Sequence, residues 1–312
     1  MMEASGDRGA LDRLLFLFSF LSFVLILRFP AVARDGVRAG LALSAKTVVP
    51  SVFPSLILTD LLFSRPCSLI EKTVGRLFPR VFRVSARGAV AWIAGLLSGF
   101  PVGAITVAND VKSGALSPEE GAYLVSFVNN TGPAFLVGGV GLGLFGSVRF
   151  GWALYLTQIP VSLFVGLLLR PKRRASKVAP SVSPGSAPDP VASIVRASEN
   201  CVRIAGFVCF FSVLSAFLAL FISDGALLAA LTSVFEIGCG ATRIAGLPFP
   251  LPALPLISFA VCFSGVSVYC QTVAVLKNAG IPSRGYLRGK ILSGTIAFFL
   301  SLLFCLTKRA AV

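Results

Sequence analysis

The chain has 312 residues, of which 55% are hydrophobic and only 13% are charged, and its formal net charge is +15. Soluble globular domains carry about 25% charged residues, so this composition excludes an ordinary soluble enzyme. The 28 lysines and arginines lie in short stretches between apolar runs, whereas a nucleic-acid-binding protein gathers them on one solvated face. We therefore expect a multi-pass protein of the cell membrane that contacts the lipid bilayer and binds no nucleic acid.

The residue types that are missing or unpaired exclude several kinds of catalytic and metal sites. The chain has no histidine, which is the commonest general base and metal ligand. Its seven cysteines form no Cys-x-x-Cys pair and lie mostly in apolar runs, which is typical of reduced, unreactive thiols. We therefore expect no enzymatic activity, no cofactor and no metal site.

The first apolar segment, residues 14–33, is long enough to cross about 30 Å of hydrocarbon. A cleaved signal peptide is the alternative, but the apolar part is long and no clear Ala-x-Ala site follows it. We expect a retained N-terminal transmembrane helix within residues 1–35.

Eight further apolar segments follow, and glycine and proline break several of them. Some broken segments are expected to be re-entrant hairpins, which enter and leave on one side of the membrane. The predicted fold is all-α: a polytopic transmembrane helical bundle with Gly/Pro-broken helices. The segments are 41–63, 88–108, 122–146, 150–169, 200–222, 225–247, 251–276 and 290–307.

Basic residues gather in three connections and in the C-terminal tail. Segments 65–87, 170–177 and 277–290 hold six, five and four lysines or arginines, and the tail adds two more. The positive-inside rule predicts that all four lie on the cytoplasmic side, against anionic lipid headgroups; a specific partner site is the alternative. Residues 171–195 are rich in proline, serine and alanine, so a cytoplasmic linker is expected there, with residues 171–193 as its core.

The parts of the chain on either side of this linker share a motif. When Ala94–Gly114 is aligned with Ala260–Gly280, eight of 21 positions are identical, among them a Ser-Gly and a Thr-Val-Ala. Repeats in membrane proteins form pseudo-symmetric halves, and transporters often build a central site from interrupted helices between them. We predict two pseudo-symmetric repeats, residues 36–170 and 196–312.

Glycine and proline interrupt the core of the first repeat at residues 98–103. Pro101 removes a backbone donor and clashes with the preceding turn, and Gly99 and Gly103 permit unusual dihedral angles. The freed backbone groups must find partners, so this segment, with Ser98, forms either a ligand or ion site or a kinked helix packed on a neighbour. The repeat favours the site. The corresponding candidates in the second repeat are Ser264, Gly265 and Ser267.

Four other polar residues interrupt apolar runs. Asn129 and Asn130 are costly there unless they form hydrogen bonds, so they either bind a polar, uncharged ligand or hold helices together. Glu236 is a candidate for binding a cation or carrying a proton, and an ion pair with Arg243 is the structural alternative. Gln271 is expected to face the same cavity as the two asparagines.

Five motifs carry a resemblance to a known family: PSVFPSLILTDLL, LLSGFPVGA, SPEEGAYLVSFVNNTGPAFLVGGVG, FEIGCG and FSGVSVYCQ. Over about residues 36–300 the chain resembles the YlbJ-type sporulation integral membrane proteins, part of the wider nucleoside-recognition or Gate-domain group. The resemblance implies a polytopic protein of endospore-forming bacteria, needed for sporulation, with Gate-like repeats similar to concentrative nucleoside carriers. The family's polar positions fall on Ser98, Gly99, Pro101, Gly103, Asn129, Asn130, Glu236, Ser264, Gly265, Ser267 and Gln271.

Two functions follow as hypotheses. The first is a transporter or permease with a central site for a small polar solute, for which the family name indicates a nucleoside, and with a cation or proton as coupling ion. The second is a membrane scaffold that recruits sporulation membrane proteins or forms a homo-oligomer. A cavity lined by the polar motifs of both halves favours the first, and dry, mutually satisfied polar contacts favour the second.

Overall fold

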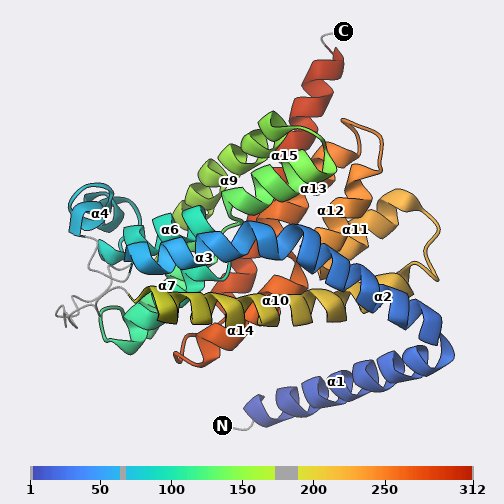
Figure 1. Cartoon of the computed structure of the whole chain (residues 1–312). Helices are drawn as coiled ribbons and strands as arrows, with labels where there is room; N and C mark the ends of the chain where they lie inside the picture. Colours follow the sequence, from blue (N-terminus) through green and yellow to red (C-terminus); the bar gives the residue numbers. More distant parts are fainter. Residues whose placement is uncertain (1–2, 64–67, 173–188, 311–312) are drawn as a thin grey trace.

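We analysed the protein as a computed structural model, which describes residues 3–63, 68–172 and 189–310. Every regular element in these ranges is a helix, which confirms the predicted all-α fold (Figure 1). Five helical segments within them are long and apolar enough to cross a membrane, as expected of a polytopic bundle. They are Pro30–Phe63, Val148–Leu168, Pro190–Leu218, Ala253–Lys277 and Arg284–Thr307.

The N-terminal region forms two helices where one span is expected. α1 (Glu3–Arg28) ends before Pro30, which has no backbone N–H to donate and therefore begins a new helix, α2 (Pro30–Leu43). α2 continues through a π-helical turn, η1 (Ser44–Val48), into α3 (Val49–Phe63). Figure 1 shows α1 standing apart from the bundle, and its apolar side chains are mostly exposed, as suits a helix surrounded by lipid.

A connector and a hairpin follow in the first half. Gly95 and Gly103 let the two helices of the hairpin approach closely, since a Cβ added to Gly95 would lie 3.2 Å from the Gly103 Cα. The broken segment 88–108 is therefore a helical hairpin. The connector comprises α4 (Ser68–Lys72), η2 (Val74–Arg76) and α5 (Phe78–Val81), and the hairpin comprises α6 (Arg87–Ser98) and α7 (Val102–Lys112).

An interrupted helix completes the first half, together with one long helix. α8 (Pro118–Val128) is capped by Ser117, whose hydroxyl accepts a hydrogen bond from the Glu120 N–H at 3.1 Å. The chain leaves helical geometry at residues 129–132 and resumes at Pro133, which leads into the π-helix η3 (Ala134–Leu144). η3 packs against the long helix α9 (Val148–Leu168).

The second half repeats this order of elements. The interruption of its third element lies at Ser264 and Gly265, which both have positive φ. Each half thus consists of a long helix, a hairpin, an interrupted helix and another long helix. The elements are α10 (Pro190–Leu218), the hairpin α11 (Gly225–Phe235) and α12 (Ile237–Ala245), the interrupted pair α13 (Ala253–Phe263) and α14 (Gly265–Lys277), and α15 (Arg284–Ala310).

The pairing within the repeat differs from the predicted alignment. The Ser-Gly at residues 98–99 ends a helix that folds back, whereas the Ser-Gly at 264–265 separates two helices that do not pack on each other, so their expected equivalence is wrong. The structure pairs the two hairpins instead, with an offset of 135 residues, the separation of Phe100 and Phe235. That offset also places Asn129, where α8 ends, on Ser264, where α13 ends. It aligns Ala94, Leu96, Ser98, Phe100 and Gly103 with Ala229, Leu231, Ser233, Phe235 and Gly238.

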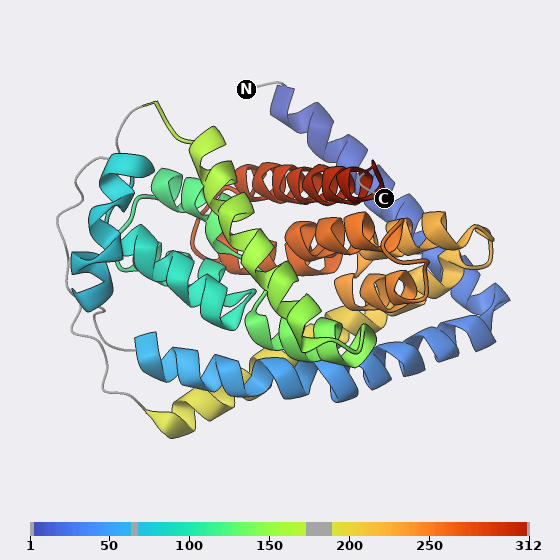
Figure 2. The same cartoon turned by 90° about the horizontal axis from the view of Figure 1, so that it is seen from above.

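The two halves run in opposite directions. α10 packs along α2 and α3 with residue numbers that fall on one helix as they rise on the other (Figure 2). The α6–α7 hairpin lies on the α4 side of the bundle and the α11–α12 hairpin on the other side (Figure 1). The halves are therefore inverted repeats. Three contacts show the antiparallel direction: Gly36 lies against Val213, Gly40 lies against Cys209, and Asp60 forms an ion pair with Arg196.

The described parts of the three basic connections cluster at the α4 end. Arg83 donates to the Lys172 carbonyl at 2.5 Å, and Ile281 packs in the same apolar cluster as Phe78. α15 starts at this end and, as a candidate membrane-crossing helix, carries the C-terminus to the opposite end (Figure 1). The prediction that the tail shares a side with the other basic segments is therefore wrong. Residues 65–67 of the first segment and 173–188 of the linker lie outside the described residues.

Candidate ligand site

A small cavity lies where the two halves meet. Both hairpin tips and both interrupted helices line it, and apolar side chains of η1, α3 and α10 close it. Its volume is about 30 Å³, which is room for one or two water molecules and too little for a nucleoside. The lining residues that offer polar side chains or an unwound backbone are Ser98, Gly99, Thr131, Gly132, Glu236 and Gln271.

The first hairpin tip contacts the first helix break through the backbone of a glycine. Gly99 has φ +85°, and an added Cβ would lie 2.5 Å from the Gly132 nitrogen. Only glycine allows this conformation and this approach. Ser98 fixes the same tip to α3, because its hydroxyl donates to the Ser55 carbonyl at 3.3 Å and also contacts the Thr59 hydroxyl.

Glu236 forms the second hairpin tip, between α11 and α12, and only 2% of it is exposed. Its Oε2 accepts a hydrogen bond from the Cys239 N–H at 2.6 Å, so the carboxylate caps α12, where the helix dipole favours negative charge. Among the residues that the structure describes, no lysine or arginine nitrogen lies within 4.0 Å of Glu236, so the alternative ion pair with Arg243 is not formed. The second break contacts this tip, since a Cβ on Gly265 would lie 3.3 Å from the Ile237 nitrogen.

Hydrogen bonds to α9 and α13 and within the segment itself stabilise the non-helical backbone of the first break. Gln158 on α9 accepts from the Thr131 N–H at 3.2 Å and donates to the Thr131 carbonyl at 2.5 Å. The Thr131 hydroxyl donates to the Val261 carbonyl on α13 at 2.6 Å. Asn130 donates to the Phe127 carbonyl at 2.9 Å. These bonds satisfy the polar groups that an interrupted helix leaves inside a membrane.

Asn129 joins the first break to the second half. Its Nδ2 lies 3.1 Å from both the Thr272 and the Tyr286 hydroxyl oxygens, and its backbone carbonyl accepts from the Lys290 Nζ at 3.0 Å. Its Oδ1 is buried and has no hydrogen-bond partner among the described residues. Lys290 is 4% exposed inside α15. The prediction that places it in a cytoplasmic loop, within segment 277–290, is therefore wrong, because α15 begins at Arg284 and buries it.

The polar residues of the second break interact mainly with their own helix. The Ser264 hydroxyl donates to the Val261 carbonyl at 3.4 Å. Gln271 lies one turn after Ser267 on α14 and donates to its hydroxyl at 3.4 Å. All three are buried, and Gln271 turns toward the cavity.

The structure brings the predicted site residues together around one point, in two groups. Ser98, Gly99, Glu236 and Gln271 line the cavity. Pro101, Gly103, Asn129, Asn130, Ser264, Gly265 and Ser267 surround it without lining it. The sequence predicts that the two asparagines face the same cavity as Gln271. In the structure neither asparagine lines the cavity, and both form hydrogen bonds with helices. Asn129 turns instead toward α14 and α15.

Sequence reasoning misses four residues of this region: Thr131, Gln158, Tyr286 and Lys290. Thr131 lies inside the Asn-Asn-Thr-Gly-Pro motif, so its position is a usable signal. Tyr286 and Lys290 are four residues apart and so share one helix face, which is a signal only once a helix is known to begin at Arg284. Gln158 is a single amide in an apolar helix, and nothing near it in the sequence indicates a partner.

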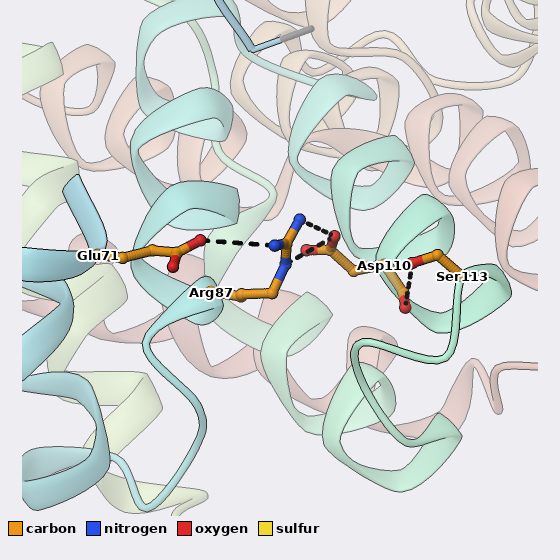
Figure 3. Close-up of polar contacts among 4 residues, drawn as sticks. All are labelled: Glu71, Arg87, Asp110 and Ser113. Atoms are coloured by element: carbon orange, nitrogen blue, oxygen red, sulfur yellow. Dashed lines mark hydrogen bonds and ion pairs between the residues drawn. The ribbon is translucent and has the colours of Figure 1, made fainter. Parts of the chain in front are cut away.

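An ion pair fixes the base of the first hairpin. Arg87 at the start of α6 donates to Asp110 on α7 through Nε at 3.0 Å and Nη2 at 2.8 Å, and its Nη1 lies 3.5 Å from Glu71 on α4 (Figure 3). Ser113 donates to the Asp110 carbonyl at 3.1 Å. The base of the hairpin is thus held by charge, whereas its tip is held by Ser98 and a glycine contact.

The site offers few ligands for a metal ion. Within residues 3–63, 68–172 and 189–310, no three histidine, cysteine, aspartate or glutamate side chains come together. Glu236 is the one carboxylate among the described residues that lines the cavity.

These features define a class: a polytopic α-helical integral membrane protein whose inverted repeats bring hairpin tips and helix breaks to one central cavity. No protein-family profile matches the chain, and no solved structure matches it. The chain is similar to the sporulation integral membrane protein YlbJ of Bacillus subtilis (strain 168), with 26% identity over 326 aligned positions that cover 90% of this chain and 79% of the relative. This similarity supports a YlbJ-type assignment, in agreement with the motifs of the sequence.

Proposed function

We propose that the chain is a permease-like membrane protein that moves a small polar solute through the cavity between its two repeats. One observation carries the proposal: residues of both hairpin tips and of both interrupted helices line the same cavity. Transporters use this arrangement to present backbone groups to a solute near the middle of the membrane.

The chemistry of the lining favours a neutral or cationic solute. Glu236 is the one ionisable side chain among the lining residues, and the others offer a hydroxyl, a carboxamide and backbone groups. A nucleoside has this character, and the name of the wider nucleoside-recognition group indicates such a solute. It requires the hairpin tips to separate from the breaks, because the cavity has only about 30 Å³. At the first tip this separation breaks the glycine contact, the hydrogen bond of Ser98 and the packing of Phe100.

A role in sporulation is part of the proposal and comes from the relative's name. A solute carrier in a sporulating cell would supply or clear a metabolite across the membrane in which it lies. The proposed activity is therefore transport in support of spore formation, without catalysis of a reaction.

A scaffold is the second candidate, and one observation favours it. Gln158 and Thr131 form two hydrogen bonds with each other, and the Asn129 side chain forms hydrogen bonds with Thr272 and Tyr286. Polar side chains join membrane helices through contacts of this kind. In that case the polar motifs hold the bundle together, and the basic connections recruit other sporulation membrane proteins.

An accessibility scan separates the two functions. Native cysteines are replaced, and single cysteines are placed in the cavity wall as Ser98→Cys, Glu236→Cys and Gln271→Cys. Ser258→Cys is the matched control, because Ser258 is equally buried but bonds to Ser301 away from the cavity. A membrane-impermeant thiol reagent is expected to label the three cavity positions and not the control.

The same scan tests the solute. One compound from a panel of nucleosides and small metabolites is expected to protect all three cavity positions together. Protein that supports sporulation but is labelled at none of them would exclude transport and leave the scaffold.

A further inference from the structure

Lys290 is only 4% exposed, and no other lysine or arginine among the described residues is buried. It lies in α15, which packs against α8, α9 and α13. Burying an ammonium group is costly unless negative or partially negative atoms surround it. A lysine placed there needs a reason beyond membrane orientation, for which an exposed lysine at the helix end suffices.

The partner of Lys290 is the polar end of an interrupted helix. Its Nζ donates at 3.0 Å to the carbonyl of Asn129, the residue at which α8 stops. Carbonyls at the C-terminal end of a helix carry partial negative charge, and in discontinuous membrane helices such carbonyls coordinate the coupling Na⁺ or take part in H⁺ coupling. The ammonium thus occupies the kind of position that a coupling cation occupies elsewhere.

No carboxylate competes for this ammonium. In the described part of the chain, no aspartate or glutamate oxygen lies within 4.0 Å of the Lys290 Nζ. The titratable groups that face it are Cys262 on α13 and, through the shared Asn129, Tyr286 on α15 itself. The remaining titratable side chains of α8 and α9 have other partners or are exposed: Glu119, Glu120, Tyr123, Arg149 and Tyr155.

We propose that Lys290 is a built-in coupling cation: its ammonium holds the first helix break in the closed arrangement, and loss of its proton releases that break. In this step one N–H bond breaks, the electron pair stays on nitrogen, and the proton passes to a water molecule. The coupling ion is then a proton, and sodium is not required. This inference rests on the proposed transport function, because it assigns the event that opens the same cavity.

The test follows the opening of the cavity with a single cysteine in a background without native cysteines. Gln271→Cys reports from the cavity, and Asn278→Cys, which is exposed, corrects at each pH for the reactivity of the thiol itself. The full-length protein is labelled with a membrane-impermeant thiol reagent at about pH 6 and about pH 10, a range that brackets deprotonation of a buried lysine. Sodium chloride is compared with choline chloride at equal concentration.

The corrected labelling rate of position 271 is expected to rise about tenfold with pH and to be indifferent to sodium. Lys290→Met removes the charge at similar volume and is expected to abolish the pH dependence. Lys290→Arg keeps the charge and is expected to hold the low rate at both pH values. Lys277→Met, the same change at an exposed lysine, is the matched control and retains the wild-type response.

Three results would overturn the inference. Unchanged pH dependence in Lys290→Met, or in Lys290→Arg if the methionine variant does not fold, rejects Lys290 as the group. Labelling that follows sodium and not pH rejects proton coupling and leaves transport standing. Absence of labelling at position 271 in every variant and condition rejects the proposed transport itself, and the coupling with it.

Discussion

At the closest helix contacts of this protein, a hydrogen atom of glycine occupies the place where any other residue has a carbon. An added Cβ would lie 2.0 Å from the Val128 carbonyl at Gly95 and 2.0 Å from the Ser126 carbonyl at Gly289. Apolar side chains gain little by leaving lipid, so membrane helices associate through such close backbone packing. The glycines of the hairpins and of α15 are therefore structural residues, distinct from the polar residues of the site.

Gly289 and Gly206 provide a matched test of this packing. Both lie within long helices, but a Cβ at Gly206 meets nothing within 4 Å. Gly289→Ala is expected to destabilise the protein by about 2 kcal/mol or more through overpacking, whereas Gly206→Ala is expected to gain up to about 1 kcal/mol of helix propensity. Thermal unfolding of the purified proteins in detergent measures both. Equal midpoints would show that α15 can shift away from α8 at no cost.

Glu236 and Lys290 mark how far single residues can be assigned from sequence. Glu236 is an isolated acid in an apolar run, and that pattern correctly indicates a buried position. Lys290 follows a polar connection that holds other basic residues, so its sequence position fits a cytoplasmic basic loop as well as it fits a buried site. Only the start of α15 at Arg284 and its packing on α8 place the amine inside the bundle.

At the scale of elements, the first hairpin has a base fixed by charge and a tip held by weaker contacts. Its base is held by the Arg87 ion pair with Asp110 and Glu71 (Figure 3). Its tip is held by the Ser98 hydroxyl and by a glycine contact with the break. An element fixed at one end and loosely held at the other moves by pivoting about its base. The ion pair is therefore expected to set the hairpin's position without being part of the cavity.

Asp110→Asn tests the base of the hairpin. The side chain of Asp110 is 8% exposed, and losing its charge leaves the Arg87 guanidinium without its closest counter-charge, for an expected cost of about 2 kcal/mol. Asp35→Asn is the control, because the Asp35 side chain is 61% exposed beside Arg34 and such a pair contributes about 0–1 kcal/mol. Thermal unfolding compares the two variants with the wild type. Similar small losses in both would mean that helix packing alone fixes the hairpin.

Sequence predicts where the helices break but not what each break becomes. Both Ser-Gly segments signal an interruption, and both are interrupted. The chain folds back at the first segment and not at the second, because the two segments contact different elements. Gly99 contacts the first break, and Gly265 contacts the second hairpin tip at Ile237. The repeat alignment fails because it is based on the shared Ser-Gly. The two hairpins, which the structure pairs, have a weaker sequence match.

At the scale of the whole molecule, inversion of the halves makes a prediction about topology. α15 carries the C-terminus to the end of the bundle opposite the α4 connector. A reporter fused after residue 312 and a reporter inserted in the linker at residues 173–188 should therefore lie on opposite sides of the membrane. With the linker cytoplasmic, an alkaline phosphatase fused at the C-terminus is expected to be active and one in the linker inactive. The same activity pattern at both sites would contradict a single crossing by α15.

The inverted repeat also bears on how the chain enters the membrane. Two halves of the same architecture must be inserted in opposite orientations, and their helices alone give the insertion machinery no reason to treat them differently. The connections do: the segment between α3 and α6 contains five basic residues, whereas the equivalent segment between α10 and α11, residues 219–224, contains none. By the positive-inside rule, this difference in charge is expected to retain the first segment on the cytoplasmic side and to let the second be translocated. If those charges were moved to residues 219–224, the second half would be driven to insert parallel to the first, and the two hairpin tips would never meet.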